Sequence, residues 1–303
     1  MGETIIPVFS GGVGRSGTTL VGRTLRSHSE VCVGSPFEIK FLTETYGLID
    51  LVFGMRKFPP TQISRKGAYI TRLIPMEPIK FRFWQFRRRI RSDWWMRTNR
   101  LGIKSGLHRA MTLNQMEILL EELGESLDKP VTAARNFLFG FVRNHRKWQG
   151  EKFWMDTTPA NIAYSDYIYR IFPEARFVEM HRNPFDNIGS IIKEPWGPNS
   201  EEHAIAWWRD RTFLAEEAKK SIPSSQFLSM KLENFVKFDR DRCYETLLNF
   251  LPVADEAKVR RYFEEEVSGE RAHIGRWKSD FSSPEAFSAL FVSIVGADYS
   301  GKY

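Results

Sequence analysis

The sequence contains few of the residues that build metal cages or disulfide frameworks. Its two cysteines, Cys32 and Cys243, lie far apart in a chain of 303 residues and have no partner nearby, so neither kind of site is expected. The six histidines show no HExxH or HxH spacing, which argues against a metal enzyme. We therefore expect two buried thiols and a chemistry that requires no metal.

Long apolar runs and targeting signals are also missing. The apolar runs are too short to cross a bilayer, and the N-terminal MGETIIPVFS has neither the basic region nor the cleavage site of a signal peptide. Gly2 follows Met1, but Ile6 stands where a myristoylation signal has Ser or Thr. We therefore expect a cytoplasmic, unanchored protein.

The composition is that of a protein with a substantial core. Hydrophobic residues make up 42% of the chain, which is ordinary for a soluble protein. No linker rich in Pro, Gly or Ser and no internal repeat divides the sequence, so we expect a single domain over residues 1–303. The formal net charge of +7 favours anionic partners such as nucleotides, polyanions or acidic lipid surfaces.

The segment Val8–Gly22, VFSGGVGRSGTTLVG, follows the pattern of a strand, a glycine-rich loop and a helix. It fits the phosphate-loop pattern GxxxxGK[ST] from Gly12 onward, except that Thr18 occupies the lysine position and Arg15 lies within the loop. Glycines let the backbone approach an anion, and the amides at the helix N-terminus point toward it. We predict an anion site here; the alternative is a tight turn without a ligand.

A second anion corner is predicted at HRNPFDNIGSII. Arg182 follows the β-prone run ARFVEM, and Ser190 lies eight residues later, one or two turns into the next helix. The alternative role for Arg182 is a surface salt or capping contact. A helix from Thr158 to Pro173 precedes this strand, and a further strand, QFLSMKL, follows. Strands that alternate with helices predict an α/β fold with a mostly parallel central sheet covered on both faces.

The region of about residues 43–150 is predicted to be a mainly helical insertion on the substrate side, with helices in MTLNQMEILLEELGESL and AARNFLFGFVRNHRKW. Within it, residues 80–100, KFRFWQFRRRIRSDWWMRTNR, mix basic and aromatic side chains. One interpretation is a solvated helix with an aromatic core face. The others are a lid that contacts an acidic substrate and a patch that contacts a membrane surface.

These motifs carry a resemblance to a known family. GGVGRSGTTLVGRTL resembles the 5′-phosphosulfate loop of the sulfotransferases, and FVEMHRNPFDNIGSI resembles their 3′-phosphate motif. EKFWMDTTPANIAYSDYIYRIFPEARFVEMHR is similar to the matching segment of tyrosylprotein and bacterial sulfotransferases, and HIGRWKSDF is similar to the C-terminal loop that closes over the nucleotide. Residues 43–149 are not matched.

The resemblance implies a three-layer P-loop-like fold and a sulfuryl donor, 3′-phosphoadenosine 5′-phosphosulfate (PAPS), with adenosine 3′,5′-bisphosphate as product. PAPS carries one 5′-phosphate bearing sulfate, so amides, hydroxyl groups and one cation can replace the kinase lysine. The donor-binding residues that it implies are Gly14, Arg15, Ser16, Gly17, Thr18, Thr19, Arg182, Ser190, Gly275, Arg276, Trp277 and Lys278.

The resemblance also implies the catalytic residues. In several branches a glutamate shortly after the first helix is the general base, and VGSPFEIKF places Glu38 there, beside Phe37 and Phe41. The alternative for Glu38 is an ion pair with Lys40. Asp156 is a rival base, although a structural capping role is expected for it.

One departure from the family concerns the group that assists the leaving group. Many relatives have Lys-Thr-Pro where this chain has Thr-Thr-Pro at residues 157–159. We expect Lys40, Lys104 or Arg15 to replace the missing lysine, and Arg15 is accordingly counted as catalytic.

The expected activity is sulfuryl transfer from PAPS to a hydroxyl group, less readily an amine, of a glycan, lipid, peptide or small metabolite. A nucleic-acid partner is not expected. The first alternative is a deviant P-loop nucleotide kinase or NTPase, which requires a Mg²⁺-holding carboxylate near the loop; the candidate strand ends are MHRN and KLEN, and neither is a hydrophobic strand that closes in Asp. The second is a non-enzymatic polyanion-binding protein, whose binding would weaken steeply with salt.

Overall fold

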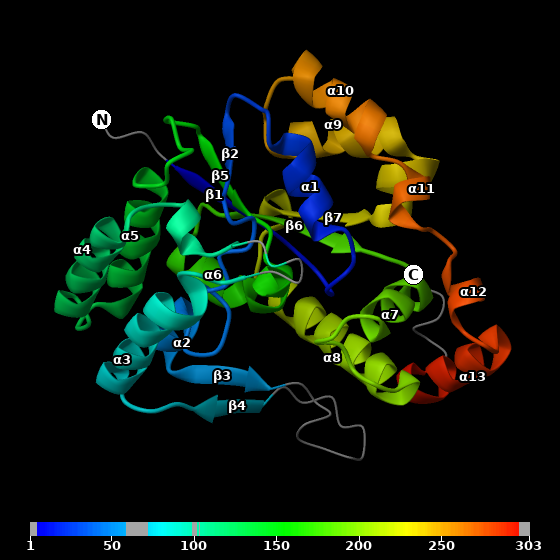
Figure 1. Cartoon of the computed structure of the whole chain (residues 1–303), viewed down its shortest axis with the longest axis horizontal. Helices are drawn as coiled ribbons and strands as arrows, with labels where there is room; N and C mark the ends of the chain where they lie inside the picture. Colours follow the sequence, from blue (N-terminus) through cyan, green and yellow to red (C-terminus); the bar gives the residue numbers. More distant parts are fainter. Residues whose placement is uncertain (1–4, 59–71, 99–101, 103, 297–303) are drawn as a thin grey trace.

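The computed structural model describes residues 5–58, 72–98, 102 and 104–296, and its main feature is a sheet of five parallel strands in the order β2-β5-β1-β6-β7. Helices cover both faces of this sheet (Figure 1). The strand bounds in chain order are Ile6–Gly11 (β1), Val31–Val33 (β2), Phe153–Asp156 (β5), Arg176–His181 (β6) and Phe227–Lys231 (β7). The predicted three-layer α/β fold with a parallel central sheet is therefore confirmed.

The helices follow the strands in the predicted alternation, with one difference after β5. Instead of an α-helix from the first residue, a 3-10 turn at Pro159–Tyr164 (η4) leads into Ser165–Ile171 (α6). The remaining helices are Thr18–Leu25 (α1), Leu48–Phe53 (α2), Ile79–Arg89 (α3), Leu113–Glu125 (α4), Pro130–Arg143 (α5), Pro184–Ile192 (α7), Glu201–Lys219 (α8), Arg240–Phe250 (α9), Ala257–Glu266 (α10), Gly269–Ala272 (α11), Trp277–Asp280 (α12) and Pro284–Val295 (α13), with short 3-10 or π turns at Ile90–Trp94, Leu107–Arg109, Ser224–Gln226 and Asn234–Phe238.

The central position of β1 decides where the functional loops meet. Ile6 of β1 pairs with Phe153 of β5, and Val8 pairs with Arg176 of β6. Because all five strands are parallel, the loops after β1, β2, β5 and β6 leave the sheet at the same edge. Ligands of open α/β sheets bind at this edge, outside the carboxyl ends of the strands.

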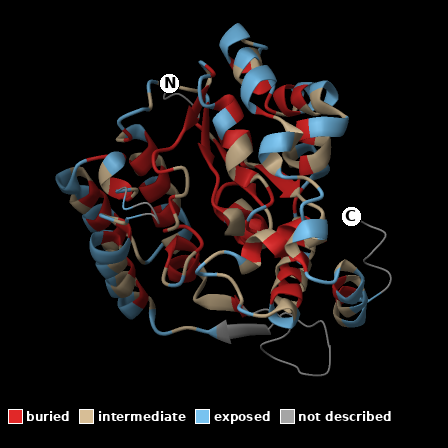
Figure 2. Ribbon diagram, turned by 45° about the vertical axis from the view of Figure 1, so that its right-hand side comes forward, coloured by how far each residue is buried: buried red, intermediate tan, exposed pale blue. Residues whose placement is uncertain are grey.

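Two apolar clusters lie on the two faces of the sheet, because successive side chains of a strand point to opposite faces. On β5, Trp154 belongs to the cluster that includes α4, α5 and α6, whereas Phe153 and Met155 belong to the cluster with α1, α9 and α10. Figure 2 shows the buried sheet in red and the exposed outer sides of the helices in pale blue. Cys32 is buried in β2, but Cys243 on α9 is only half-buried, contrary to expectation.

A third apolar cluster joins α7, α8 and α13 near the carboxyl edge of the sheet. Phe281 and Phe287 stack there with ring centroids 3.7 Å apart. This cluster holds the C-terminal segment close to α7 (Figure 1). Helices α12 and α13 therefore lie close to the edge where the functional loops meet.

The described residues between 43 and 150 include the helices α2, α3, α4 and α5, and they also form an antiparallel hairpin of Met55–Phe58 (β3) and Arg72–Pro75 (β4). Helix α5 of this region is part of the core: Phe141 packs edge-on against Trp154 of β5, with ring centroids 6.3 Å apart. In the basic aromatic segment Phe86 is buried, whereas Trp84 is exposed; residues 99 and 100 lie outside the described part. None of the described helices is both long and apolar enough to span a bilayer.

Candidate active site

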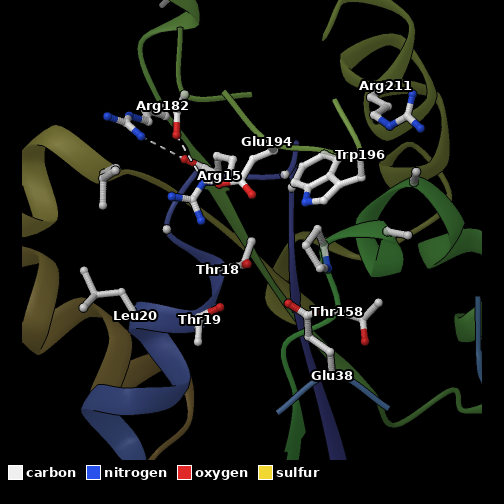
Figure 3. A pocket seen from close by; sticks show the side chains of 18 of the residues that line it. Arg15, Thr18, Thr19, Leu20, Glu38, Thr158, Arg182, Glu194, Trp196 and Arg211 are labelled. Carbon is white, nitrogen blue, oxygen red and sulfur yellow. Dashed lines mark hydrogen bonds and ion pairs between the residues drawn. The ribbon is translucent and has the colours of Figure 1, made fainter. Parts of the chain in front are cut away.

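A cavity of about 1450 Å³ lies at the carboxyl edge of the sheet. It receives side chains from the loops after β1, β2, β5 and β6 (Figure 3). The residues predicted from sequence that line it are Gly14, Arg15, Gly17, Thr18, Thr19, Glu38, Arg182, Ser190 and Arg276. The fold thus brings both predicted anion corners and the predicted base to one space.

The loop after β1 has the backbone conformation that its glycines allow. Gly12 and Gly17 have φ of 146° and 94°, and Arg15 also lies in the left-handed region with φ of 71°. A Cβ atom on Gly12 would lie 2.4 Å from the carbonyl oxygen of Met180, so this position requires glycine. Helix α1 begins at Thr18, and its first amides have no acceptor within the helix. These amides and the helix dipole favour an anion at this loop.

Arg15 connects the loop to the second corner. Its Nε donates a hydrogen bond to Oγ of Ser190 at 3.1 Å and lies 3.6 Å from Oε1 of Glu194. About half of the Arg15 side chain is exposed to the cavity and solvent. The predicted pairing of the two corners is therefore present as a direct contact between their side chains.

Arg182 links three segments through its guanidinium group. Nη1 donates to the carbonyl oxygen of Arg15 at 3.1 Å, and Nη2 donates to that of Ala272 at 3.0 Å. Its Nε and the Oγ of Ser16 are buried and have no hydrogen-bond partner among the described residues. Burial lowers the pKa of Arg182, with Asp186 acting in the opposite direction. The group is a desolvated cation at the cavity wall, and unsatisfied buried donors of this kind favour an anionic ligand.

Helix α7 anchors both neighbouring loops, a role that the sequence analysis did not assign. Asn187 Nδ2 donates to the carbonyl oxygen of Gly14 at 3.0 Å. The buried carboxylate of Asp186 accepts hydrogen bonds from the amides of Gly275 at 2.7 Å and Trp277 at 2.9 Å. The C-terminal loop is thus fixed to the second anion corner.

The four predicted residues of the C-terminal loop lie in different environments. Arg276 lines the cavity and its Nε lies 3.2 Å from Oδ1 of Asp280. The half-buried ring of Trp277 packs on Phe185 with centroids 4.8 Å apart, and Lys278 is exposed. In this structure Trp277 therefore contributes to the third apolar cluster.

Glu38 lies in the loop after β2 and lines the cavity. Its two neighbours fix that loop to the end of β5: the Thr157 amide donates to the Phe37 carbonyl at 2.9 Å, and the Ile39 amide donates to Asp156 Oδ1 at 3.0 Å. Among the described residues no cation pairs with Glu38, since Lys40 Nζ lies instead 3.3 Å from Oε1 of Glu44. The Glu38 carboxylate is available to a ligand.

Asp156 is the anchor of this arrangement. Its buried carboxylate accepts hydrogen bonds from the Ile39 amide, from the Thr158 amide and hydroxyl at 3.3 and 3.1 Å, and from Asn161 Nδ2 at 2.7 Å. Burial raises the pKa of Asp156 to about 6, although these hydrogen bonds act in the opposite direction. The structural role expected for Asp156 agrees with these contacts.

Asp156 stands where the kinase or NTPase alternative would need a carboxylate that holds Mg²⁺. β5 is a hydrophobic strand that ends in an aspartate beside β1, the kind of strand that a magnesium-dependent NTPase requires; the sequence analysis weighed only the ends of two other strands. The oxygens of Asp156 are occupied by protein donors. Among the described residues, no three His, Cys, Asp or Glu side chains gather in a way that would hold a metal ion.

Several cations surround the cavity besides the predicted ones. Of the three expected replacements for the missing lysine, Arg15 and Lys40 line the cavity, and Lys104 is exposed outside it. The sequence analysis missed Lys57, whose Nζ lies 2.5 Å from Oδ1 of Asp166 and whose pKa is lowered by burial. It also missed Arg211, which reaches the cavity from α8.

The family model described as "Sulfotransferase family" matches residues 7–256. No curated protein matches the chain. Among solved structures, the sulfotransferase domain of the Synechococcus PCC 7002 olefin synthase is similar, with 13% identity, coverage of 98% of this chain and 95% of that chain, and a TM-score of 0.56. The sulfotransferase domain from the curacin biosynthetic pathway has 13% identity, 97% and 98% coverage, and a TM-score of 0.53. At these identities the structures support the fold alone.

Proposed function

The chain belongs to the sulfotransferase family, and we propose that it transfers the sulfuryl group of PAPS to a hydroxyl group, less readily to an amine. The acceptor is a group on a glycan, lipid, peptide or small metabolite. We also propose a cytoplasmic location. Family membership supports the reaction class. The identity of the donor and the roles of the residues are inferred from the side chains that line the cavity.

The observation that carries the proposal is the contact between the two anion corners. Arg15 of the first corner bonds to Ser190 of the second, and Arg182 bonds to the backbone of Arg15. A ligand with two separate anionic groups fits this pair better than a linear triphosphate does, because each corner presents its own arginine and hydroxyl groups. PAPS has a 5′-phosphosulfate and a 3′-phosphate.

The arrangement of the two corners, including the unsatisfied Ser16 Oγ and Arg182 Nε, supports the following donor contacts. The loop amides, Ser16, Thr18, Thr19 and Arg15 would bind the 5′-phosphosulfate, whereas Arg182 and Ser190 would bind the 3′-phosphate. Arg276 reaches the same cavity from the C-terminal loop. Buried donors without a partner are costly, so an anion that accepts from them stabilises the site.

The reaction itself is an in-line displacement at sulfur. The acceptor oxygen forms a bond to sulfur while Glu38 accepts the hydroxyl proton, and the bond between sulfur and the bridging oxygen breaks. The electron pair of that bond leaves with the phosphate of adenosine 3′,5′-bisphosphate. Negative charge develops on the bridging oxygen, where Arg15 and the loop amides stabilise it. The chain thus contributes positioning, one base and a cationic wall.

Transfer of radiolabelled sulfate from PAPS tests this proposal. The protein would be incubated with PAPS and separate pools of glycans, lipids, peptides and small hydroxyl compounds, and labelled product and adenosine 3′,5′-bisphosphate would be measured. We expect both to form in equal amounts with one pool. Arg182→Ala should abolish most of the signal, and Arg242→Ala, which removes an exposed arginine on α9, should not. Consumption of PAPS in no pool would reject the proposal.

A further inference from the structure

The cavity extends from the donor corners to one face of α8. Trp207 and Arg211 lie four residues apart on this helix and both line the cavity, as expected for positions i and i+4 on one helix face. The guanidinium carbon of Arg211 lies 3.7 Å from the centroid of the Trp207 ring. In Figure 3, Arg211 is on α8 and Trp196 lies between it and Arg15.

Arg211 differs from the other cations of this part of the cavity because it has no acidic partner there. Arg56 pairs with Asp50, Lys57 with Asp166 and Arg89 with Glu44. Among the described residues, no carboxylate and no hydrogen-bond acceptor contacts the Arg211 guanidinium. The carboxylate of the preceding Asp210 lies 3.1 Å from Nη2 of Arg209.

Partial burial affects the charge state of Arg211. It lowers the pKa of Arg211 to about 10, while the nearby charge of Asp210 acts in the opposite direction. The side chain is therefore still charged at neutral pH. Arg211 is half-buried, and an anion that enters the cavity and accepts hydrogen bonds from its guanidinium would stabilise the charged form.

Two indole rings lie near the donor loop, and one of them also contacts Arg211. A Cβ atom on Gly14 would lie 3.4 Å from Cη2 of Trp196 and 3.7 Å from Cη2 of Trp207, so the tips of both rings lie beside Gly14. The centroids of the two rings are 6.2 Å apart and their planes are inclined by 44°. The tip of the Trp207 ring is near Gly14 and Arg211 lies over the face of that ring, so the guanidinium reaches the cavity from α8 rather than from the two donor corners.

We propose that Arg211 binds an anionic group of the acceptor, a carboxylate, sulfate or phosphate, while a ring of the same molecule lies along Trp196 and Trp207. The enzyme then selects acidic, ring-containing hydroxyl compounds. This inference rests on the proposed function, since it names the acceptor class of the same cavity. With a neutral analogue of the acceptor the half-buried guanidinium of Arg211 stays unpaired, so such an analogue should bind more weakly.

Matched acid and neutral compounds test the inference. The protein would be saturated with adenosine 3′,5′-bisphosphate, and binding would be measured by calorimetry for two pairs: 4-hydroxyphenylacetate with 4-hydroxyphenylacetamide, and phenyl β-glucuronide with phenyl β-glucoside. In at least one pair the acid should bind about 10- to 100-fold more tightly than its neutral partner. Arg211→Gln should remove that preference.

The matched control is Lys220→Gln, which removes one positive charge at the exposed C-terminal end of the same helix and should keep the preference for the acid. Arg211→Lys, which keeps the charge but loses the planar pair of donors, should keep part of it; this variant decides the question if Arg211→Gln does not fold. The proposal is overturned if neither pair shows a preference in the wild type, or if the preference survives in Arg211→Gln.

The experiment distinguishes a wrong proposed function from a wrong role for Arg211. If adenosine 3′,5′-bisphosphate does not bind, the proposed function is wrong and the inference falls with it. If the bisphosphate binds but acid and neutral compounds bind alike, only the role of Arg211 is wrong.

Discussion

Arg15 and Ser190 are 175 positions apart in the chain, yet Nε of Arg15 donates a hydrogen bond to Oγ of Ser190 at 3.1 Å. The contact joins the loop after β1 to the helix after β6, two neighbouring strands of the parallel sheet. Arg182 reinforces it by donating to the Arg15 carbonyl oxygen at 3.1 Å. The two corners are therefore held as one unit, which a ligand with two anionic groups can bridge.

Removal of Arg182 should weaken donor binding. Arg182→Ala loses a charge-assisted contact to the proposed 3′-phosphate, so the affinity for adenosine 3′,5′-bisphosphate should fall by about 10- to 100-fold. Ser190→Ala removes a neutral hydroxyl group and should have a smaller effect. Titration calorimetry measures both.

Arg242→Ala is the control for charge, because this exposed arginine lies on α9. It should bind the bisphosphate as the wild type does. Wild-type affinity in both Arg182→Ala and Ser190→Ala would show that the second corner is not the 3′-phosphate site.

Glu38→Gln should affect the chemical step alone. The amide keeps the shape of the side chain but cannot accept the proton, so kcat should fall by about 10²- to 10⁴-fold while bisphosphate affinity is unchanged. Rates with the acceptor identified by labelled transfer give this comparison. Normal turnover in Glu38→Gln would place the base elsewhere, and Asp156 would be the next residue to replace.

The C-terminal loop should respond to nucleotide. Asp186 holds the amides of Gly275 and Trp277, so Asp186→Ala should increase the hydrogen-exchange rate of residues 275–278. In the wild type, adenosine 3′,5′-bisphosphate should slow exchange there, because Arg276 of this loop lines the donor cavity. Exchange that is the same with and without the bisphosphate would indicate a loop fixed only by its packing on Phe185.

His145 should make the protein less stable in mild acid. Burial lowers the pKa of His145 from 6.5 to about 4, and its Nε2 lies 3.0 Å from the amide nitrogen of Ser35. The unfolded chain takes up the proton first as the pH falls. The contribution of the neutral His145 to the free energy of unfolding is therefore complete above pH 6.5 and is lost toward pH 4. Its upper limit is about 3 kcal/mol.

Comparison with His145→Gln isolates this contribution. The raised pKa of Asp156 makes the free energy of unfolding change with pH in the opposite direction, between the ordinary pKa of that group and about 6. Taking the difference between the two proteins cancels this effect. Urea unfolding at several pH values between 7 and 4 measures the difference in free energy of unfolding between the two proteins. That difference should shrink as the pH falls. A difference that is constant with pH would contradict a buried, neutral His145.

The meeting of the two predicted anion corners could be predicted from the sequence because each corner is a local pattern. Glycine, arginine and hydroxyl residues follow an apolar strand and precede a helix within one short segment, so the parallel sheet alone brings the two corners to the same edge. The loop of Glu38 is similar, since it follows β2. These parts depend on backbone direction rather than on side-chain packing.

The role of Arg211 could not be predicted in the same way. AWWRDR is typical of many amphipathic helices, and only the packing of α8 places Trp207 beside Gly14 and leaves Arg211 without a carboxylate among the described residues. Asp186 was overlooked for a related reason: its partners, Gly275 and Trp277, come from a distant segment. The hairpin of β3 and β4 was missed because its short, charged strands lack an alternating apolar pattern.

The central claim is that the cavity binds a nucleotide with separate 3′- and 5′-anionic groups. Calorimetric titration with adenosine 3′,5′-bisphosphate in the absence of Mg²⁺, set beside ATP with and without Mg²⁺, tests it most directly. The account predicts tight, metal-independent binding of the bisphosphate and at least about 10-fold weaker binding of ATP in either condition. Equal or tighter binding of ATP with Mg²⁺ would contradict it and favour a nucleotide kinase or NTPase.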